Sequence, residues 1–125
     1  MTSTRRHIPI YTTSGLVGAY LYYPHIFNIA GEWIGWVTRE REVYSVLGHY
    51  VGWLSDDPRI LRKRSRTFTK PRKTPPKPPT KLRHPVTSPL PPMMRELPFT
   101  EVDVLDDEPE RLSPLHSAEL RNDME

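Results

Sequence analysis

The sequence has no cysteine, and its six glycines all lie at or before Gly52. The absence of thiols excludes disulfide frameworks, thiolate nucleophiles and cysteine-ligated zinc or iron–sulfur sites. Long apolar runs are also lacking, because the longest stretch without Asp, Glu, Lys or Arg, residues 7–31, is interrupted by Thr, Ser, Pro, His and Asn. We therefore expect no transmembrane segment and a soluble, cytoplasmic protein.

Recognisable catalytic and ligand-binding motifs are likewise lacking. The five histidines show no metal-ligand spacing, and no glycine precedes the Lys-Ser/Thr pair of a phosphate-binding loop. Asp56 and Asp57 stand directly before Pro58, which is typical of a turn and not of a carboxylate pair for acid–base catalysis. We therefore expect no cofactor, no metal and no catalytic residue, and a protein that is not an enzyme.

The composition divides the chain into three parts. All tryptophans and tyrosines lie at or before Trp53, whereas twelve of the fifteen prolines lie from Pro71 onward. Residues 59–83 carry eleven Lys or Arg and no acid, and residues 101–125 carry nine acids and two Arg. Segments so rich in proline and poor in large apolar residues bury too little surface to offset chain entropy. We expect a folded domain at 8–69, a disordered, basic proline-rich linker at 70–98 and a disordered acidic tail at 99–125.

Within the first half, a unit of twelve residues aligns three times without gaps. The copies occupy residues 10–21, 26–37 and 43–54, and their starting points are 16 and then 17 residues apart. Each copy opens with an aliphatic or β-branched residue and an aromatic, then has a turn glycine, a small residue and a second aromatic. The glycine, small and aromatic positions of the three copies are Gly15, Ala19, Tyr20, Gly31, Gly35, Trp36, Gly48, Gly52 and Trp53.

This pattern predicts an all-β fold built from repeated β-hairpins, each of which needs its neighbours to bury its apolar face. The small residue in the second strand indicates the close approach of a neighbouring backbone or of an aromatic ring. Residues Ile60 to Phe68 fit a fourth, degenerate copy, with Ser65 and Thr69 at its two small positions. The alternative is a short β-meander whose turns happen to contain glycine, but the joint recurrence of the columns favours repetition.

The spacing of aromatic, glycine, small and second aromatic residues, clearest over Val43 to Leu54, resembles the four-fold beta flower domain of small bacterial proteins. The resemblance covers about residues 8–69, and those proteins similarly follow the repeats with a proline-rich basic stretch and a short tail. It implies three to four hairpins around a pseudo-four-fold axis. It implies no activity, because no reaction or catalytic residue accompanies the fold.

The basic segment supports two functional interpretations. Its cations would attract nucleic-acid phosphates or another anionic surface without sequence preference. The candidate anion-binding residues are Arg62, Lys63, Arg64, Arg66, Lys70, Arg72 and Lys73. Alternatively, residues 72–78 match R-x-x-P-x-x-P and residues 76–81 match P-x-x-P-x-K, patterns of polyproline II peptides that dock in aromatic grooves. A semi-rigid, solubilising spacer remains the third interpretation.

We expect a non-enzymatic protein-interaction or scaffold module, with another protein as its partner. The alternative is nonspecific binding of nucleic acid or an anionic surface through residues 59–83. The acidic tail predicts either a linear motif that docks on another protein or a segment that folds back on the basic block. An open hairpin edge would also permit a homodimer.

Overall fold

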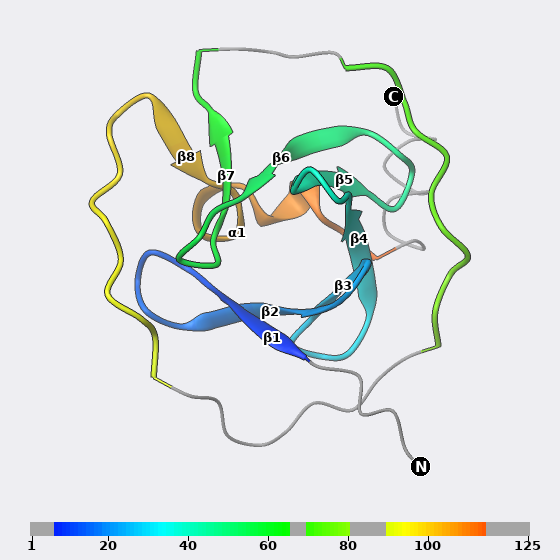
Figure 1. Ribbon diagram of the computed structural model, residues 1–125, viewed down its shortest axis with the longest axis horizontal. Helices are drawn as coiled ribbons and strands as arrows, with labels where there is room; N and C mark the ends of the chain where they lie inside the picture. The colour runs from blue at the N-terminus through cyan, green and yellow to red at the C-terminus, as the bar shows by residue number, and fades with distance from the viewer. Residues whose placement is uncertain (1–6, 66–69, 81–89, 115–125) are drawn as a thin grey trace.

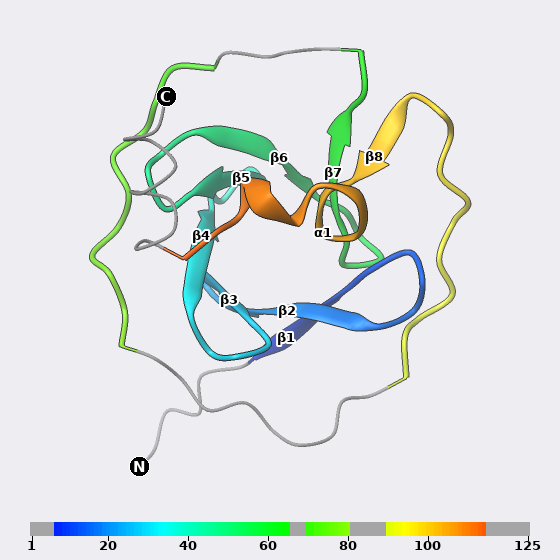
Figure 2. The ribbon, with the colours of Figure 1, turned by 180° about the vertical axis from the view of Figure 1, so that it is seen from behind.

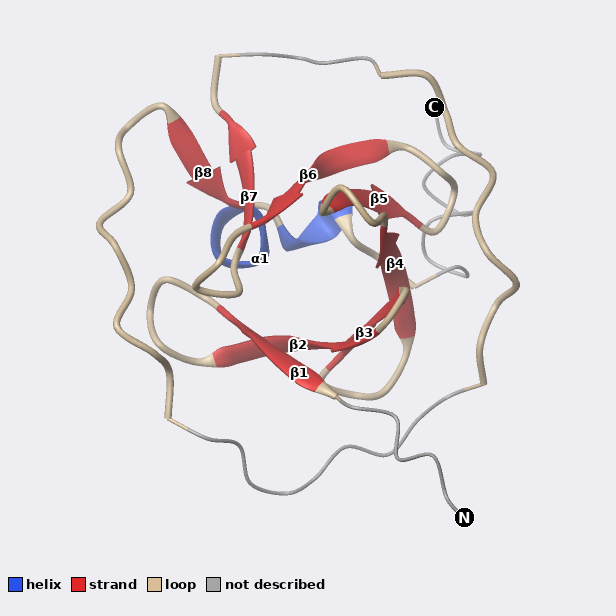
Figure 3. Cartoon of the chain, in the orientation of Figure 1, coloured by secondary structure: helices blue, strands red, loops and turns tan. Residues whose placement is uncertain are grey.

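The computed structural model describes residues 7–65, 70–80 and 90–114, which form an antiparallel sheet of eight strands in chain order. Figure 1 and Figure 3 show the strands curled around a common centre. The predicted all-β fold of hairpin repeats is confirmed. The elements are β1 Ile8–Tyr11, β2 Val17–Tyr22, β3 His25–Asn28, β4 Trp33–Val37, β5 Glu42–Ser45, β6 Tyr50–Leu54, β7 Ile60–Lys63, β8 Glu101–Asp103, the short helix α1 Val104–Asp107 and the 3-10 turn η1 Pro109–Arg111.

The three hairpins β1–β2, β3–β4 and β5–β6 share one backbone geometry. Gly15, Gly31 and Gly48 have φ of 90°, 86° and 89°, a left-handed region that residues with a Cβ rarely adopt. In each hairpin the glycine N–H donates to the carbonyl oxygen three residues earlier. The strand register also shifts at one shared position, between the two residues that open each copy. The sequence repeat therefore corresponds to a repeat of backbone conformation, including a β-bulge at the same position of each hairpin.

The small position of the second strand faces a backbone carbonyl of the next hairpin. A Cβ added to Gly35 would lie 2.6 Å from the Tyr44 carbonyl oxygen, and one added to Gly52 would lie still closer to the Leu61 carbonyl oxygen. These strands therefore reach their neighbours because no side chain intervenes. Ala19 fills the same position in the first copy, where it is fully buried.

The fourth hairpin joins two strands that are far apart in the sequence. β7 pairs with β6 on one side and with β8 on the other, where Leu61 is opposite Asp103 and Lys63 is opposite Glu101. The second strand thus comes from residues 99–114 of the predicted acidic tail, which we name the acidic segment. It does not come from the residues that directly follow β7. Residues 66–69, which would have completed a contiguous fourth copy, lie outside the described residues.

The acidic segment departs from the disordered tail predicted for residues 99–125. Val102, Val104 and Leu112 are buried, and the last two belong to the same apolar cluster as the hairpins. Acidic and apolar residues alternate here, and the carboxylates have partners as well: Glu101 and Glu108 pair with Arg95 and Arg62, and Asp103 accepts hydrogen bonds from Thr13. Residues 99–114 are therefore part of the folded structure, and residues 115–125 lie outside the described residues.

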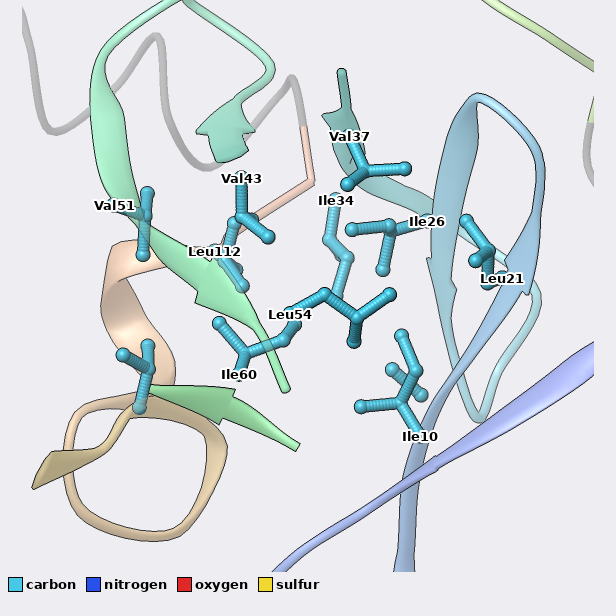
Figure 4. Close-up of a cluster of buried hydrophobic side chains, with 12 residues drawn as sticks. Ile10, Leu21, Ile26, Ile34, Val37, Val43, Val51, Leu54, Ile60 and Leu112 are labelled. Atoms are coloured by element: carbon cyan, nitrogen blue, oxygen red, sulfur yellow. The ribbon is translucent and has the colours of Figure 1, made fainter. Parts of the chain in front are cut away.

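The sheet separates its apolar side chains into two layers. The inner layer is aliphatic and fills the centre of the ring, where side chains from successive hairpins meet Leu112 (Figure 4). The outer layer is mostly aromatic, because successive side chains of a strand point to opposite faces. Its buried members are Tyr20, Tyr22, Phe27, Trp33, Trp36, Tyr44 and Val46. Figure 2 shows α1 and η1 lying across one end of the ring.

The described parts of the connection from β7 to β8 lie outside the ring. They lie along opposite sides of the sheet (Figure 1), and we name them the proline-rich segment (residues 70–80) and the return segment (residues 90–100). The sequence predicted disorder for both, yet each bonds to a hairpin. The Lys73 N–H donates to the Gly48 carbonyl oxygen at 3.0 Å, and the Tyr11 hydroxyl donates to the Leu90 carbonyl oxygen at 3.4 Å.

Replacing Gly52 by alanine should destabilise the fold by about 3 kcal/mol, because the new methyl group would force β6 away from β7. Gly18→Ala is the control, since a Cβ there meets side chains of Thr12 and Leu105 at 3.1 and 3.2 Å, which can move, and should cost about 1 kcal/mol or less. Urea unfolding measures both. Equal losses of stability would show that the backbone contact at Gly52 does not limit the fold.

Val104→Ala tests whether the acidic segment contributes to the core. Val104 is fully buried, so losing its two methyl groups should lower the free energy of unfolding by about 2 kcal/mol. Leu90→Ala removes a side chain that is 91% exposed and should change stability by less than about 0.5 kcal/mol. If thermal unfolding finds the two variants equally stable, α1 does not pack on the ring in solution.

Candidate functional site

A buried polar cluster, and not a ladder of backbone hydrogen bonds, joins the first and last strands of the sheet. Arg59 is fully buried, and its guanidinium donates to the Asp57 carboxylate at 2.5 Å and to the Thr13 hydroxyl at 3.1 Å. The Asp103 carboxylate accepts from the Thr13 backbone N–H and hydroxyl at 2.7 and 2.6 Å. Because Thr13 follows β1 and Asp103 ends β8, these bonds close the ring. The homodimer through an open hairpin edge stays a prediction.

The same cluster fixes the loop between β6 and β7. Burial acts to raise the pKa of Asp57, but hydrogen bonds from Arg59 and Ser55 outweigh burial and hold that pKa below its ordinary value. The Ser55 hydroxyl donates to Asp57 at 2.5 Å and also accepts the Arg59 backbone N–H at 3.0 Å. Arg59 further donates to the Arg95 carbonyl oxygen at 2.8 Å, which holds the return segment beside this loop. The Ser55 hydroxyl therefore serves the structure of this loop.

Two of the arginines predicted to bind anions, Arg62 and Arg64, bond to other groups of the same chain. Arg62 forms a bidentate pair with Glu108 at 2.6 and 2.7 Å. Arg64 donates to a carbonyl oxygen of the return segment at 2.6 Å, and its guanidinium lies over that segment's phenylalanine ring. Lys63 is exposed, and Arg66 lies outside the described residues.

The proline-rich segment is docked on an aromatic surface formed by β4, β5 and β6, which we name the Trp36 face. Trp36 and Tyr44 stack with their ring centroids 4.9 Å apart, and Tyr50 meets Tyr44 edge-on at 5.7 Å. Lys70 lies over the Tyr50 ring at 4.7 Å and Lys73 over the Tyr44 ring at 5.4 Å. Cation–π attraction therefore adds to the apolar contact between segment and sheet.

Polar bonds reinforce this docking. Lys70 pairs with Glu42, and the hydrogen bond from Lys70 is the main cause of a Glu42 pKa below its ordinary value. Arg72 donates to the Leu47 carbonyl oxygen at 2.7 Å. Three more residues predicted to bind anions therefore have partners within the chain: Lys70, Arg72 and Lys73.

The remainder of the proline-rich segment continues across the aromatic layer. Thr74 and Pro76 line one hollow together with Trp36. The His25 Nε2 donates to the Lys77 carbonyl oxygen at 3.0 Å. The segment therefore crosses two hairpins as an extended peptide that presents cations and proline to aromatic rings.

A second and larger groove, which we name the Trp53 groove, lies where the loop after β6 faces the return segment. Its volume is about 650 Å³. The residues that line it are Glu40, Arg41, Trp53, Leu54, Ser55, Asp56, Asp57, Met93 and Arg95.

Trp53 differs from the other two tryptophans. The Trp33 indole N–H donates to the Gly35 carbonyl oxygen at 2.7 Å, and the Trp36 indole N–H donates to the Ser45 carbonyl oxygen at 3.1 Å. Trp53 is only half-buried, and within residues 7–65, 70–80 and 90–114 its indole N–H has no acceptor. An apolar ring with an available donor is a typical anchor for a bound partner.

The position of Trp53 opposite the fourth hairpin explains why its indole ring is not stacked on another aromatic ring among those that the structure describes. In the sheet Trp36 is paired with Tyr44, whereas Trp53 is paired with Leu61. The fourth hairpin begins with Ile60 and Leu61, so the aromatic residue that opens the other copies is missing. This break in the aromatic column is the sequence signal that would have singled out Trp53 as more than a core residue.

Carboxylates are prominent at the rim of the Trp53 groove. The side chain of Asp56 is fully exposed, and Glu40 is exposed as well. Arg41 lies 3.9 Å from Asp56, but its guanidinium donates to two carbonyl oxygens at the end of β6. Arg95 pairs with Glu101 at 2.6 Å. From the sequence, Glu40 had no predicted role and Asp56 was predicted only to lie in a turn.

In the described part of the chain, no group of three or more His, Asp or Glu side chains could hold a metal ion. The helices of that part are all too short and too polar to cross a membrane. The groups that the Trp53 groove presents are an indole ring with its N–H, the exposed carboxylates of Glu40 and Asp56, and the side chains of Arg41 and Arg95.

Comparison with known proteins supports one family. A family model described as "4-fold beta flower protein" matches residues 8–119. The match extends beyond the three hairpins and includes the proline-rich segment, the return segment, β8 and α1. No curated protein and no solved structure matched the chain.

Acid should weaken the attachment of α1 to β7. Hydrogen bonds from Arg62 and then from Arg111 lower the pKa of Glu108 from its ordinary 4.5 to about 2, against the opposing effect of burial. The pair therefore stabilises the fold above pH 4.5 and loses its effect as the pH falls from 4.5 toward 2. Glu108→Gln should cost about 1–3 kcal/mol at pH 7, and the difference from the parent chain should narrow by pH 3.

Urea unfolding at pH 7 and pH 3 measures this dependence. Asp107→Asn removes the same charge from an exposed neighbour and should change stability at pH 7 by less than about 0.5 kcal/mol. A stability difference for Glu108→Gln that stays constant from pH 7 to pH 3 would contradict the role of the ion pair.

Proposed function

Because the chain belongs to the 4-fold beta flower family, whose description names a fold and no reaction, we propose that it is a non-enzymatic module that binds a peptide segment of another protein. The binding site is the Trp53 groove. The observation that carries the proposal is the half-buried Trp53 indole, with its ring unstacked and its N–H without an acceptor among the described residues.

The chemistry of the groove supports this function. Tryptophan buries a large apolar area on binding, and its N–H fixes the orientation of a partner's carbonyl group. The return segment is bonded to the buried Arg59, so one wall of the groove is held in place before a ligand arrives. A preformed groove costs less ordering on binding than a flexible one.

The alternative of nonspecific nucleic-acid binding through residues 59–83 has less support. Arg59 is fully buried, and five of the seven candidate anion-binding residues bond to other groups of the chain. Those five residues are Arg62, Arg64, Lys70, Arg72 and Lys73. Anion binding at these positions would first have to break contacts that the fold already makes.

Selection of a displayed library of random peptides against the full chain tests the proposed function. Met93 is fully exposed at the rim, so Met93→Arg should obstruct the groove without disturbing the fold. Selected peptides should bind Met93→Arg and Trp53→Leu at least about fivefold more weakly than the parent chain, a loss of about 1 kcal/mol.

Leu90→Arg is the matched control, because Leu90 is 91% exposed in the same segment and does not line the groove. It should bind the selected peptides as the parent chain does. Thermal unfolding of Trp53→Leu shows whether that variant keeps the fold. Selected peptides that bind Met93→Arg and Trp53→Leu undiminished would contradict a binding site at Trp53.

A further inference from the structure

We propose that the ligand of the Trp53 groove is a basic, proline-containing peptide of another protein. This inference rests on the proposed function and narrows it to one class of ligand. The observation behind it is that the chain already holds such a peptide, its own proline-rich segment, on the Trp36 face.

The Trp36 face and the Trp53 groove are related by the repeat. Trp36 and Trp53 occupy the same column in consecutive copies, 17 residues apart. Each lies in the second strand of its hairpin, paired with the first strand of the next one. Glu40 lines both hollows. What docks on one tryptophan is therefore a guide to what fits the other.

The internal peptide shows which groups the repeat recognises. Pro76 and Thr74 share the hollow with Trp36, and Lys70 and Lys73 approach aromatic rings and the carboxylate of Glu42. A polyproline II peptide makes no hydrogen bonds within itself, so its carbonyl groups remain available to donors of the site. In the Trp53 groove the indole N–H is such a donor.

The charge of the Trp53 groove fits the same class of peptide. Asp56 is fully exposed and Glu40 is exposed, so both carboxylates can meet an incoming Lys or Arg. Two cations lie nearby: Arg41 is 3.9 Å from Asp56 while its guanidinium donates to two carbonyl oxygens of the chain, and Arg95 pairs with Glu101. Complementary charges at a rim favour association and select against acidic peptides.

The chain's own proline-rich segment is not free to fill this second groove. Its residue Lys73 is bonded through the backbone to Gly48, and a Cβ at Gly48 would collide with the Lys73 carbonyl oxygen. Lys77 is bonded to His25 on the β3–β4 hairpin. Because the proline-rich segment is held on the Trp36 face, we assign the occupant of the Trp53 groove to another chain.

The test uses a synthetic peptide with the sequence of residues 70–79, Lys-Pro-Arg-Lys-Thr-Pro-Pro-Lys-Pro-Pro, added to the ¹⁵N-labelled full chain. The chain has three indole N–H signals, and Trp53→Phe identifies the one from Trp53. We expect the Trp53 signal to shift in a saturable way. The Trp33 and Trp36 signals, whose N–H groups are bonded internally, should stay in place.

Charge reversal separates groove recognition from general attraction. The double variant Glu40→Lys with Asp56→Lys should lower the affinity for the peptide by about tenfold, because two contacts at the rim become repulsive. Asp106→Lys with Asp107→Lys changes the same net charge on two exposed residues of α1 and should leave binding within about twofold. Dispersed amide signals confirm that both variants are folded.

Two altered peptides test the ligand class itself. A peptide with every Lys and Arg replaced by Glu, and one with every proline replaced by alanine, should each bind at least about fivefold more weakly. The inference is overturned if either binds as well as the original, if reversal at Glu40 and Asp56 has no effect, or if only the Trp36 signal shifts. If selected peptides depend on Trp53 but are neither basic nor proline-containing, the ligand class is wrong and the proposed function stands.

Discussion

The fold depends on the buried guanidinium of Arg59. A charge removed from water is costly unless it is paired and hydrogen-bonded, and here Asp57, Thr13 and the carbonyl of Arg95 supply the partners. These bonds connect the beginning of the sheet, its fourth hairpin and the return segment at a single point. The Tyr11 N–H adds a bond to the Pro58 carbonyl at 2.8 Å, so that the polar cluster and one backbone bond close what the strand ladder leaves open. The position of the Trp53 groove, between the Arg59 loop and the return segment, follows from this closure.

The two apolar layers explain why a chain with so basic and proline-rich a connection is nevertheless folded. A single curled sheet can bury its inner aliphatic face by itself, but its outer aromatic face needs a cover. The proline-rich segment provides part of that cover, with prolines that need no ladder hydrogen bonds and lysines that lie over tyrosine rings. The features that suggested a solvated linker therefore serve contact with the sheet.

The sequence was informative wherever the determinants are local. Turn glycines at Gly15, Gly31 and Gly48 and the small residues at Gly35 and Gly52 are set by backbone geometry within one or two strands, so their recurrence predicted the hairpins. The pairing of β7 with β8 was not predicted, because its two strands are separated by the whole outer connection and β8 is only three residues long. Acid-rich composition suggested a disordered tail, yet Asp103 and Glu108 have specific partners in Thr13 and Arg62. The hypothesis that the acidic segment folds back on the basic block is thus supported at Glu108. Trp53 was recognised as a repeat position. That its indole ring has no aromatic neighbour among the described residues follows from its pairing with Leu61, which belongs to another hairpin.

The split fourth hairpin also affects the order in which the domain can be assembled. A ribosome releases the chain from its N-terminus, so β1 to β7 leave the exit tunnel well before β8 and Leu112. Until then β7 is an unpaired edge, the contact of Thr13 with Asp103 cannot form, and the end of the ring that α1 covers is bare. Completion therefore waits for one of the most distant pairings in the molecule, the kind of contact that slows folding most. In a nascent chain the edge of β7 is therefore open to pairing with a strand of another chain until β8 is available.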